Sequence, residues 1–178
     1  MNENDVVVWS KETFLKWADF QAESNPATFE DSHSVIKYKF TWTINSEKID
    51  EQILFLIENI RISVEFFPHL SWVRISQNTD RLLNHEQGHF DLAEMIRQEY
   101  IEKLQAVFYG KHFPTRGQNE EQQKQFAKED SGRMIAEEIE KLEQVLAKRR
   151  QEYDAMTEFG HNIEKQLEFD LEFNKLRS

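Results

Sequence analysis

Two histidines four residues apart, with a glutamate directly after the first, form the run His85-Glu86-Gln87-Gly88-His89. A helix turns by about 100° per residue, so both imidazoles project from one face and can reach a single ion. Glu86 then lies beside that ion, where a carboxylate can take a proton from metal-bound water and return it to a leaving amine. Imidazole nitrogens favour zinc, and a catalytic zinc needs three protein ligands and one open position. The run therefore predicts a Zn²⁺ site with His85 and His89 as ligands and Glu86 as general base.

The residues around this run predict the helix that must carry it. Asn78, Thr79 and Asp80 offer N-cap side chains, and the helix should extend to about Phe108. Its apolar stripe is expected at Leu82, Ala93, Ile96, Tyr100 and Val107. The two histidines lie in line with this stripe, so they should face the interior. The alternative is a pair of core histidines bonded to neighbouring carbonyl groups, which leaves Glu86 unexplained.

Two histidines need a third protein ligand to hold a catalytic zinc. Asp91 and Glu94 are unsuitable because they lie about 200° and about 140° around the helix from His89. The ligand must come from another part of the chain. The candidates are His161, Asp154, a carboxylate such as Glu137 or Glu138, and the distant His33, His69 and His112.

The rest of the chain predicts strands first and helices second. Residues 34–45 alternate between apolar and polar side chains, which indicates a half-buried strand. Residues 49–67 also alternate, with a slip near Glu58-Asn59 that indicates strands with a bulge or break. Apolar spacing then predicts a long helix over 119–156 and a last helix over 162–176 with Ile163, Leu167 and Leu171. We therefore expect an α+β fold in a single domain, 1–178, with an antiparallel sheet in 1–76 and long helices in 79–178.

Composition limits the kinds of partner. The 33 acidic and 22 basic residues give a formal net charge of −11, which argues against nucleic acid or an anionic membrane. The chain has no cysteine, so His, Asp and Glu are the plausible strong metal ligands. No segment is long and apolar enough to predict a membrane span, and residues 1–5 are polar. The sequence as it stands predicts a cytoplasmic protein, or a secreted or periplasmic one if a signal has been removed.

Several segments together resemble a known family. They are Ser71-Trp72-Val73, then Leu83-Asn84-His85-Glu86-Gln87-Gly88-His89-Phe90-Asp91-Leu92-Ala93-Glu94, then Tyr153-Asp154-x-x-Thr157, with Trp9 and Asp19-Phe20 near the start. In these segments the chain resembles the bacterial family of predicted secreted zinc-dependent proteases once classified as domain of unknown function 922. The resemblance covers nearly the whole chain. It implies a zincin-like fold, with the His-Glu-x-x-His helix at its centre, and a peptide substrate.

The chain departs from the family at one position of the second motif. The family pattern is Tyr-Asp-x-x-Thr-x-His-Gly, and its histidine is a natural third ligand, but Phe159 stands there in this chain. We expect His161, two positions later, to replace it as the third ligand; the alternatives are that a carboxylate serves or that the site is weakened and inactive. The resemblance further implies that Asp154 and Thr157 orient a ligand imidazole and that Tyr153 steadies an oxyanion.

Three functions remain open from the sequence. The first is a zinc-dependent peptidase, with the peptide paired to an exposed strand edge such as that of the strand before the helix. The second is a zinc-binding module or pseudo-enzyme without activity, which Phe159 favours. The third is a structural helical protein with a coiled-coil partner or a second copy, although its apolar positions keep no strict seven-residue repeat.

Overall fold

The computed structural model describes residues 5–178, so the part of the export prediction that concerns residues 1–4 lies outside the described residues. The strands are β1 (Val7–Val8), β2 (Ser32–His33), β3 (Ile36–Ile49), β4 (Gln52–Phe66), β5 (Trp72–Val73) and β6 (Phe113–Pro114). The helices are α1 (Asp80–Phe108), α2 (Glu120–Thr157) and α3 (Ile163–Lys175). Short 3-10 helices cover Trp17–Asp19, Pro68–Leu70 and Ile75–Gln77.

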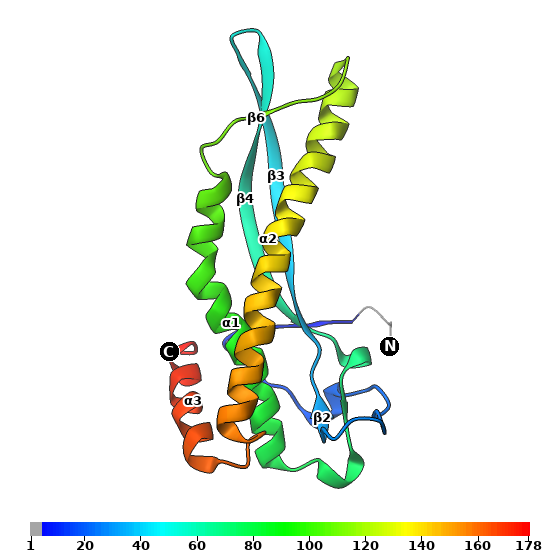
Figure 1. Ribbon diagram of the computed structural model, residues 1–178, viewed down its shortest axis with the longest axis vertical. Helices are drawn as coiled ribbons and strands as arrows, with labels where there is room; N and C mark the ends of the chain where they lie inside the picture. The colour runs from blue at the N-terminus through cyan, green and yellow to red at the C-terminus, as the bar shows by residue number, and fades with distance from the viewer. Residues whose placement is uncertain (1–4) are drawn as a thin grey trace.

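The fold is α+β, with an N-terminal antiparallel sheet followed by three helices, as predicted. The molecule is elongated (Figure 1). The β3–β4 hairpin and α2 run along its long axis, and α3 packs beside the lower ends of α1 and α2. Among residues 5–178, no helix is long and apolar enough to cross a membrane.

Strand β4 is the centre of the main sheet. One of its edges pairs with β3 along the whole hairpin. The other edge pairs with β1 at Phe66 and Glu65 and with β6 at Leu54 and Phe55. Strands β2 and β5 form a separate two-stranded antiparallel sheet.

The predicted slip near Glu58-Asn59 is a bulge within one continuous strand. Thr41 pairs with Arg61 but Thr43 pairs with Glu58, so the single residue Trp42 opposes two residues of β4. Asn59 has a positive φ of 52°, which is the kind of backbone kink that a bulge needs. The hairpin turns at Asp50 and Glu51, both with positive φ, which suits the twist of a two-residue turn.

Helix α1 begins and ends where the sequence predicts. The Thr79 side chain accepts a hydrogen bond from the Leu82 backbone N–H, and the helix ends at Phe108. Its buried face differs at the C-terminal end, because Leu104 and Phe108 are buried while Val107 is 38% exposed. The core lies between this face, α2 and the sheet, and Phe66, Phe90 and Ile96 are fully buried within it.

Helix α3 packs with a different face from the one expected. The predicted apolar residues Ile163, Leu167 and Leu171 are all more than half exposed. Gln166 and Phe173 are buried instead. This orientation of α3 places the amide side chain of Gln166 in the protein interior beside His85.

Candidate metal centre

Two imidazoles and one carboxylate meet where α1 and α2 cross. The ligand atoms of His85, His89 and Asp154 all lie within 4.8 Å of one another. Asp154 Oδ1 lies 3.0 Å from Nε2 of His85 and 2.9 Å from Nε2 of His89. Both histidines are buried, and Asp154 is partly exposed. This is a buried triad that could bind a metal ion.

Hydrogen bonds behind His85 determine which nitrogen is free to bind an ion. Gln166 Nε2 donates to Asp170 Oδ1 at 2.8 Å, and because a carboxylate only accepts, the amide nitrogen must face Asp170. The amide oxygen of Gln166 then faces His85 Nδ1 at 3.0 Å, which must carry the proton. In neutral His85 the lone pair on Nε2 therefore points at the carboxylate of Asp154. Two lone pairs that face each other at 3.0 Å are the arrangement that a cation between them would satisfy.

The phenol of Tyr153 supports both imidazoles from behind. Its ring stacks on His85 with centroids 4.6 Å apart and meets His89 edge-on at 5.0 Å. Its hydroxyl donates to the backbone carbonyl of His85 at 3.0 Å and accepts from Gln166. Burial raises the pKa of Tyr153 far above its usual value. The hydroxyl is thus occupied within the protein, which leaves the predicted oxyanion role without geometric support.

Glu86 lies next to the cluster with one oxygen free. Ser32 donates to Glu86 Oε1 at 2.6 Å, whereas the buried Oε2 has no hydrogen-bond partner among the described residues. Burial by itself would raise the pKa of Glu86, but the charges of His89 and His85 and the Ser32 hydrogen bond outweigh it, so the pKa is lowered. A buried, ionised carboxylate with a free oxygen is suited to accept a proton.

The pKa of Asp154 is also lowered. Burial opposes this shift, but His85 and His89, whose Nε2 atoms lie within 3.0 Å of the Asp154 carboxylate, outweigh burial when those nitrogens carry protons. Burial acts in the opposite sense on His89, where it lowers the pKa and favours the neutral imidazole. The donor set is one carboxylate and two imidazoles, which is a set that zinc accepts.

The end of α2 places Asp154 against α1. Glu158, Phe159 and Gly160 follow one another with positive φ, and they turn the chain from α2 into α3. Gly160 approaches α1 so closely that an added Cβ would lie 2.9 Å from Cβ of His85. A glycine is required here for both its conformation and its size.

The structure brings most of the predicted site residues together but not His161. Thr157 lies where an orienting group was expected, with its hydroxyl 3.4 Å from His85 Nδ1. His161 is exposed beyond the left-handed turn and is not a member of the cluster. Asp154, which the sequence offered both as a candidate third ligand and as an orienting group, is the third member of the cluster. Phe159, at the position of the family histidine, packs edge-on against Phe29 with ring centroids 5.9 Å apart and is not part of the cluster.

The other candidate ligands have different partners. Asp91 accepts hydrogen bonds from Trp9, Gln87 and Arg177. Glu94 binds Arg97 at 2.6 Å, so both carboxylates that helix geometry excluded are held elsewhere. Glu138, His33 and His112 also form ion pairs outside the cluster, with Lys141, Glu30 and Glu47 respectively.

Sequence reasoning missed Ser32 and Gln166. Ser32 lies in β2, more than fifty residues before Glu86, and no motif marks it. Gln166 is a polar residue of α3, and the apolar pattern of that helix predicts that a different face is buried. Its place four residues after the N-cap Asn162 puts it at the end of the first turn but does not show that it is buried. Comparisons of this chain with protein-family models, curated proteins and solved structures found no match.

Proposed function

We propose that this protein is a zinc-dependent metallopeptidase of the family that the sequence resembles. The observation that carries the proposal is the convergence of His85, His89 and Asp154 beside a buried Glu86 with one unpaired oxygen. Two imidazoles and a carboxylate with a position left open form the donor set of many catalytic zinc sites. The unpaired Oε2 of buried Glu86 fits a site that is completed by groups outside the protein.

Each residue has a role in this proposal. A bound zinc ion would polarise a substrate carbonyl and lower the pKa of a water molecule. Glu86 would accept the proton of such a water through Oε2 and pass it to the leaving amine, while Ser32 holds Oε1. Gln166 and Thr157 keep His85 in the tautomer that leaves Nε2 free. Tyr153 holds both rings in place.

The test is to measure zinc content and peptide hydrolysis in the parent protein and in Glu86→Gln. Glutamine keeps the shape of the side chain but cannot take up a proton at neutral pH. We expect about one zinc per chain in both proteins and a loss of hydrolysis of about 10²–10⁴-fold in the variant. Equal hydrolysis by both proteins would contradict the role of Glu86, and no zinc in the parent after incubation with excess metal would contradict the proposal as a whole.

A second candidate is a metal-binding module without hydrolysis. Deep burial favours it, because His85, His89 and Glu86 are each at most 3% exposed and a substrate must reach them. In that case the parent protein binds zinc stoichiometrically but cleaves no member of a random peptide pool. The same two measurements therefore separate the two candidates.

A further inference from the structure

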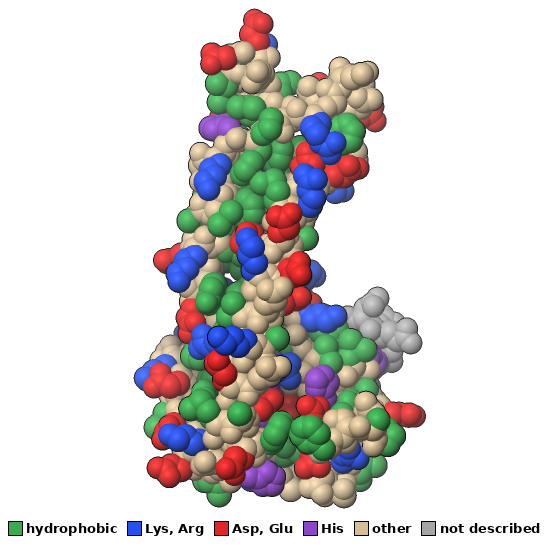
Figure 2. All heavy atoms as spheres, in the orientation of Figure 1, with side chains coloured by type: hydrophobic (Ala, Val, Ile, Leu, Met, Phe, Trp, Pro, Cys, Tyr) green, Lys and Arg blue, Asp and Glu red, His purple; other side chains and the backbone are tan. Residues whose placement is uncertain are grey.

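A groove opens between the distal half of the β3–β4 hairpin and the first turns of α2, far from the metal cluster. Its volume is about 660 Å³. Ala127 lines it and Asp154 belongs to the metal cluster, so the rise of about 1.5 Å per residue along α2 separates the two sites by about 40 Å. Figure 2 shows apolar side chains gathered between the hairpin and α2 in the upper half of the molecule. The groove cannot be a subsite of the metal centre.

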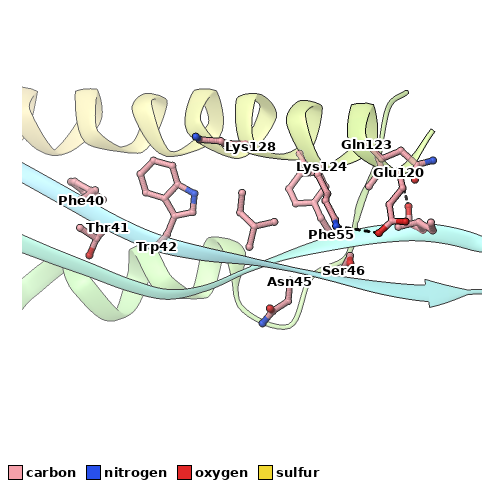
Figure 3. A pocket seen from close by; sticks show the side chains of 14 residues that line it. Phe40, Thr41, Trp42, Asn45, Ser46, Phe55, Glu120, Gln123, Lys124 and Lys128 are labelled. Carbon is pink, nitrogen blue, oxygen red and sulfur yellow. Dashed lines mark hydrogen bonds and ion pairs between the residues drawn. The ribbon is translucent and has the colours of Figure 1, made fainter. Parts of the chain in front are cut away.

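The groove exists because the two elements that face each other do not fill the space between them. Phe40, Trp42 and Ile44 of β3 line it, and in Figure 3 Phe40 and Trp42 point toward α2. Opposite them, α2 contributes the small Ala127 and the polar Gln123. The large apolar side chains of β3 thus face a part of α2 that contributes no large apolar side chain to the groove. An apolar space of this size lies in the range of ligand sites.

The groove includes a free strand edge. Among residues 5–178, β3 pairs with β4 alone, and no strand pairs with its other edge. Thr41 and Asn45 also line the groove, although Figure 3 shows them pointing to the opposite side of the strand from Trp42. Residues from both faces of β3 can line the same groove only if the groove extends around the edge of that strand. Backbone N–H and C=O groups are therefore available beside the apolar floor.

The helix rim of the groove carries an unbalanced positive charge. Lys124 pairs with Glu120 at 3.1 Å, and both residues line the groove. Lys128 also lines the groove, is exposed, and has no ion pair among the described residues. In a chain with a net charge of −11, a cation left over at the entrance complements a carboxylate on whatever binds there.

We propose that this groove binds an extended polypeptide segment that adds a strand to the free edge of β3. Its main chain pairs with β3, apolar side chains at alternate positions enter the groove, and an acidic residue meets Lys128. Strand addition uses all three features of the groove, namely the edge, the apolar floor and the cation. A fatty acid would use the floor and the cation but leave the edge unpaired. The proposal goes beyond the metal centre, since binding here requires no metal and no hydrolysis.

The experiment measures peptide binding to the full chain carrying Glu86→Gln, so that no probe is cleaved. The probes are blocked peptides with Val, Leu or Phe at alternate positions and a terminal Glu, the same peptides N-methylated on the pairing edge, and palmitate. We expect the unmodified peptides to bind and N-methylation to weaken binding about tenfold or more, because it removes backbone donors. Titration calorimetry provides the readout.

Two variants test the position of the binding site. Ala127→Leu fills the groove and Lys128→Glu reverses its rim charge, and each should weaken peptide binding about tenfold. Lys148→Glu is the matched control, since Lys148 is an exposed lysine on the same helix outside the groove, and binding should not change. Melting curves establish that the variants fold. If Ala127→Leu does not fold, Lys128→Glu still tests the proposal.

Each of the other outcomes would overturn the proposal. Equal binding of N-methylated and unmodified peptides would exclude strand addition. Binding of palmitate without peptide would make the groove a lipid site. Concentration-dependent dimerisation blocked by the same two variants would assign the free edge to a second copy of the chain. If the folded protein binds none of the probes, the proposal that β3 binds a peptide is wrong.

Discussion

The two ends of this elongated molecule differ in how their polar groups are used. At the base, where α1, α2 and α3 meet, buried polar side chains form a connected network through His85, Gln166 and Tyr153. In the arm, formed by the distal hairpin and the start of α2, an apolar sheet faces a helix with small and polar side chains, and a groove remains. The polar side chains at the base are therefore fixed by one another, whereas the poorly matched surfaces of the arm leave open space, and the single helix α2 contributes to both regions.

The largest effect should come from removing the carboxylate at the base. We expect Asp154→Ala to weaken zinc binding by more than the roughly 100-fold typical of lost supporting contacts, because a direct ligand is lost. His161→Ala is the matched control and should bind zinc as the parent does, since His161 lies outside the cluster. Competition titration with a chelator measures both affinities. Loss of zinc from His161→Ala with retention in Asp154→Ala would reverse the assignment.

A smaller effect should follow from removing the group that orients His85. Gln166→Leu deletes the acceptor for His85 Nδ1–H and should weaken zinc binding by about 10–100-fold. Gln98→Leu changes the same residue type at an exposed position of α1 and serves as the control. If both variants bind zinc with the affinity of the parent, the network behind His85 does not influence the metal.

Two glycines compare the packing of the base with that of the arm. Gly88→Ala places a Cβ 2.0 Å from the Tyr153 hydroxyl, so we expect a loss of unfolding free energy of about 1–3 kcal/mol. Gly132→Ala places its Cβ 3.9 Å from the nearest atom, in Trp42, so we expect a gain of about 0.5–1 kcal/mol from helix propensity. Urea unfolding measures both changes. Changes of the same sign and size would show that the two ends are packed alike.

The smallest effect should be a pH dependence in the metal-free protein. Burial lowers the pKa of His89 in the folded state, so the unfolded state, with a value of about 6.5, binds its proton more readily. Stability is therefore retained above about pH 6.5 and decreases as the pH falls below it. Melting temperatures between pH 8 and pH 5 measure this, and His89→Gln should flatten the curve over that range. A melting temperature that rises toward pH 5 would contradict the shift.

Local patterns predicted the helices and the sheet well. Thr79 capped α1 as expected, and the bulge near Glu58-Asn59 was visible as a slip in the alternation. These features depend on neighbours in the sequence, which is why periodicity and capping residues reveal them. His85, Glu86 and His89 were identified because one helix turn determines their relative positions.

The remaining parts of the site depend on contacts between distant elements. Asp154 was one candidate ligand among several, and His161 was preferred because it lay near the position of the family histidine. The choice depends on how α2 packs on α1 and on the left-handed turn after Glu158, which spacing does not determine. The same limit applies to α3, because its apolar stripe pointed to Leu167 while the fold buries Gln166.

The most direct test of the metal centre is anomalous X-ray diffraction at the zinc absorption edge from crystals of the protein grown with zinc. The proposal predicts a single strong peak between Nε2 of His85, Nε2 of His89 and the carboxylate of Asp154, with Glu86 beside it. A peak at His161 instead, or no peak at His85 and His89 under saturating zinc, would contradict it.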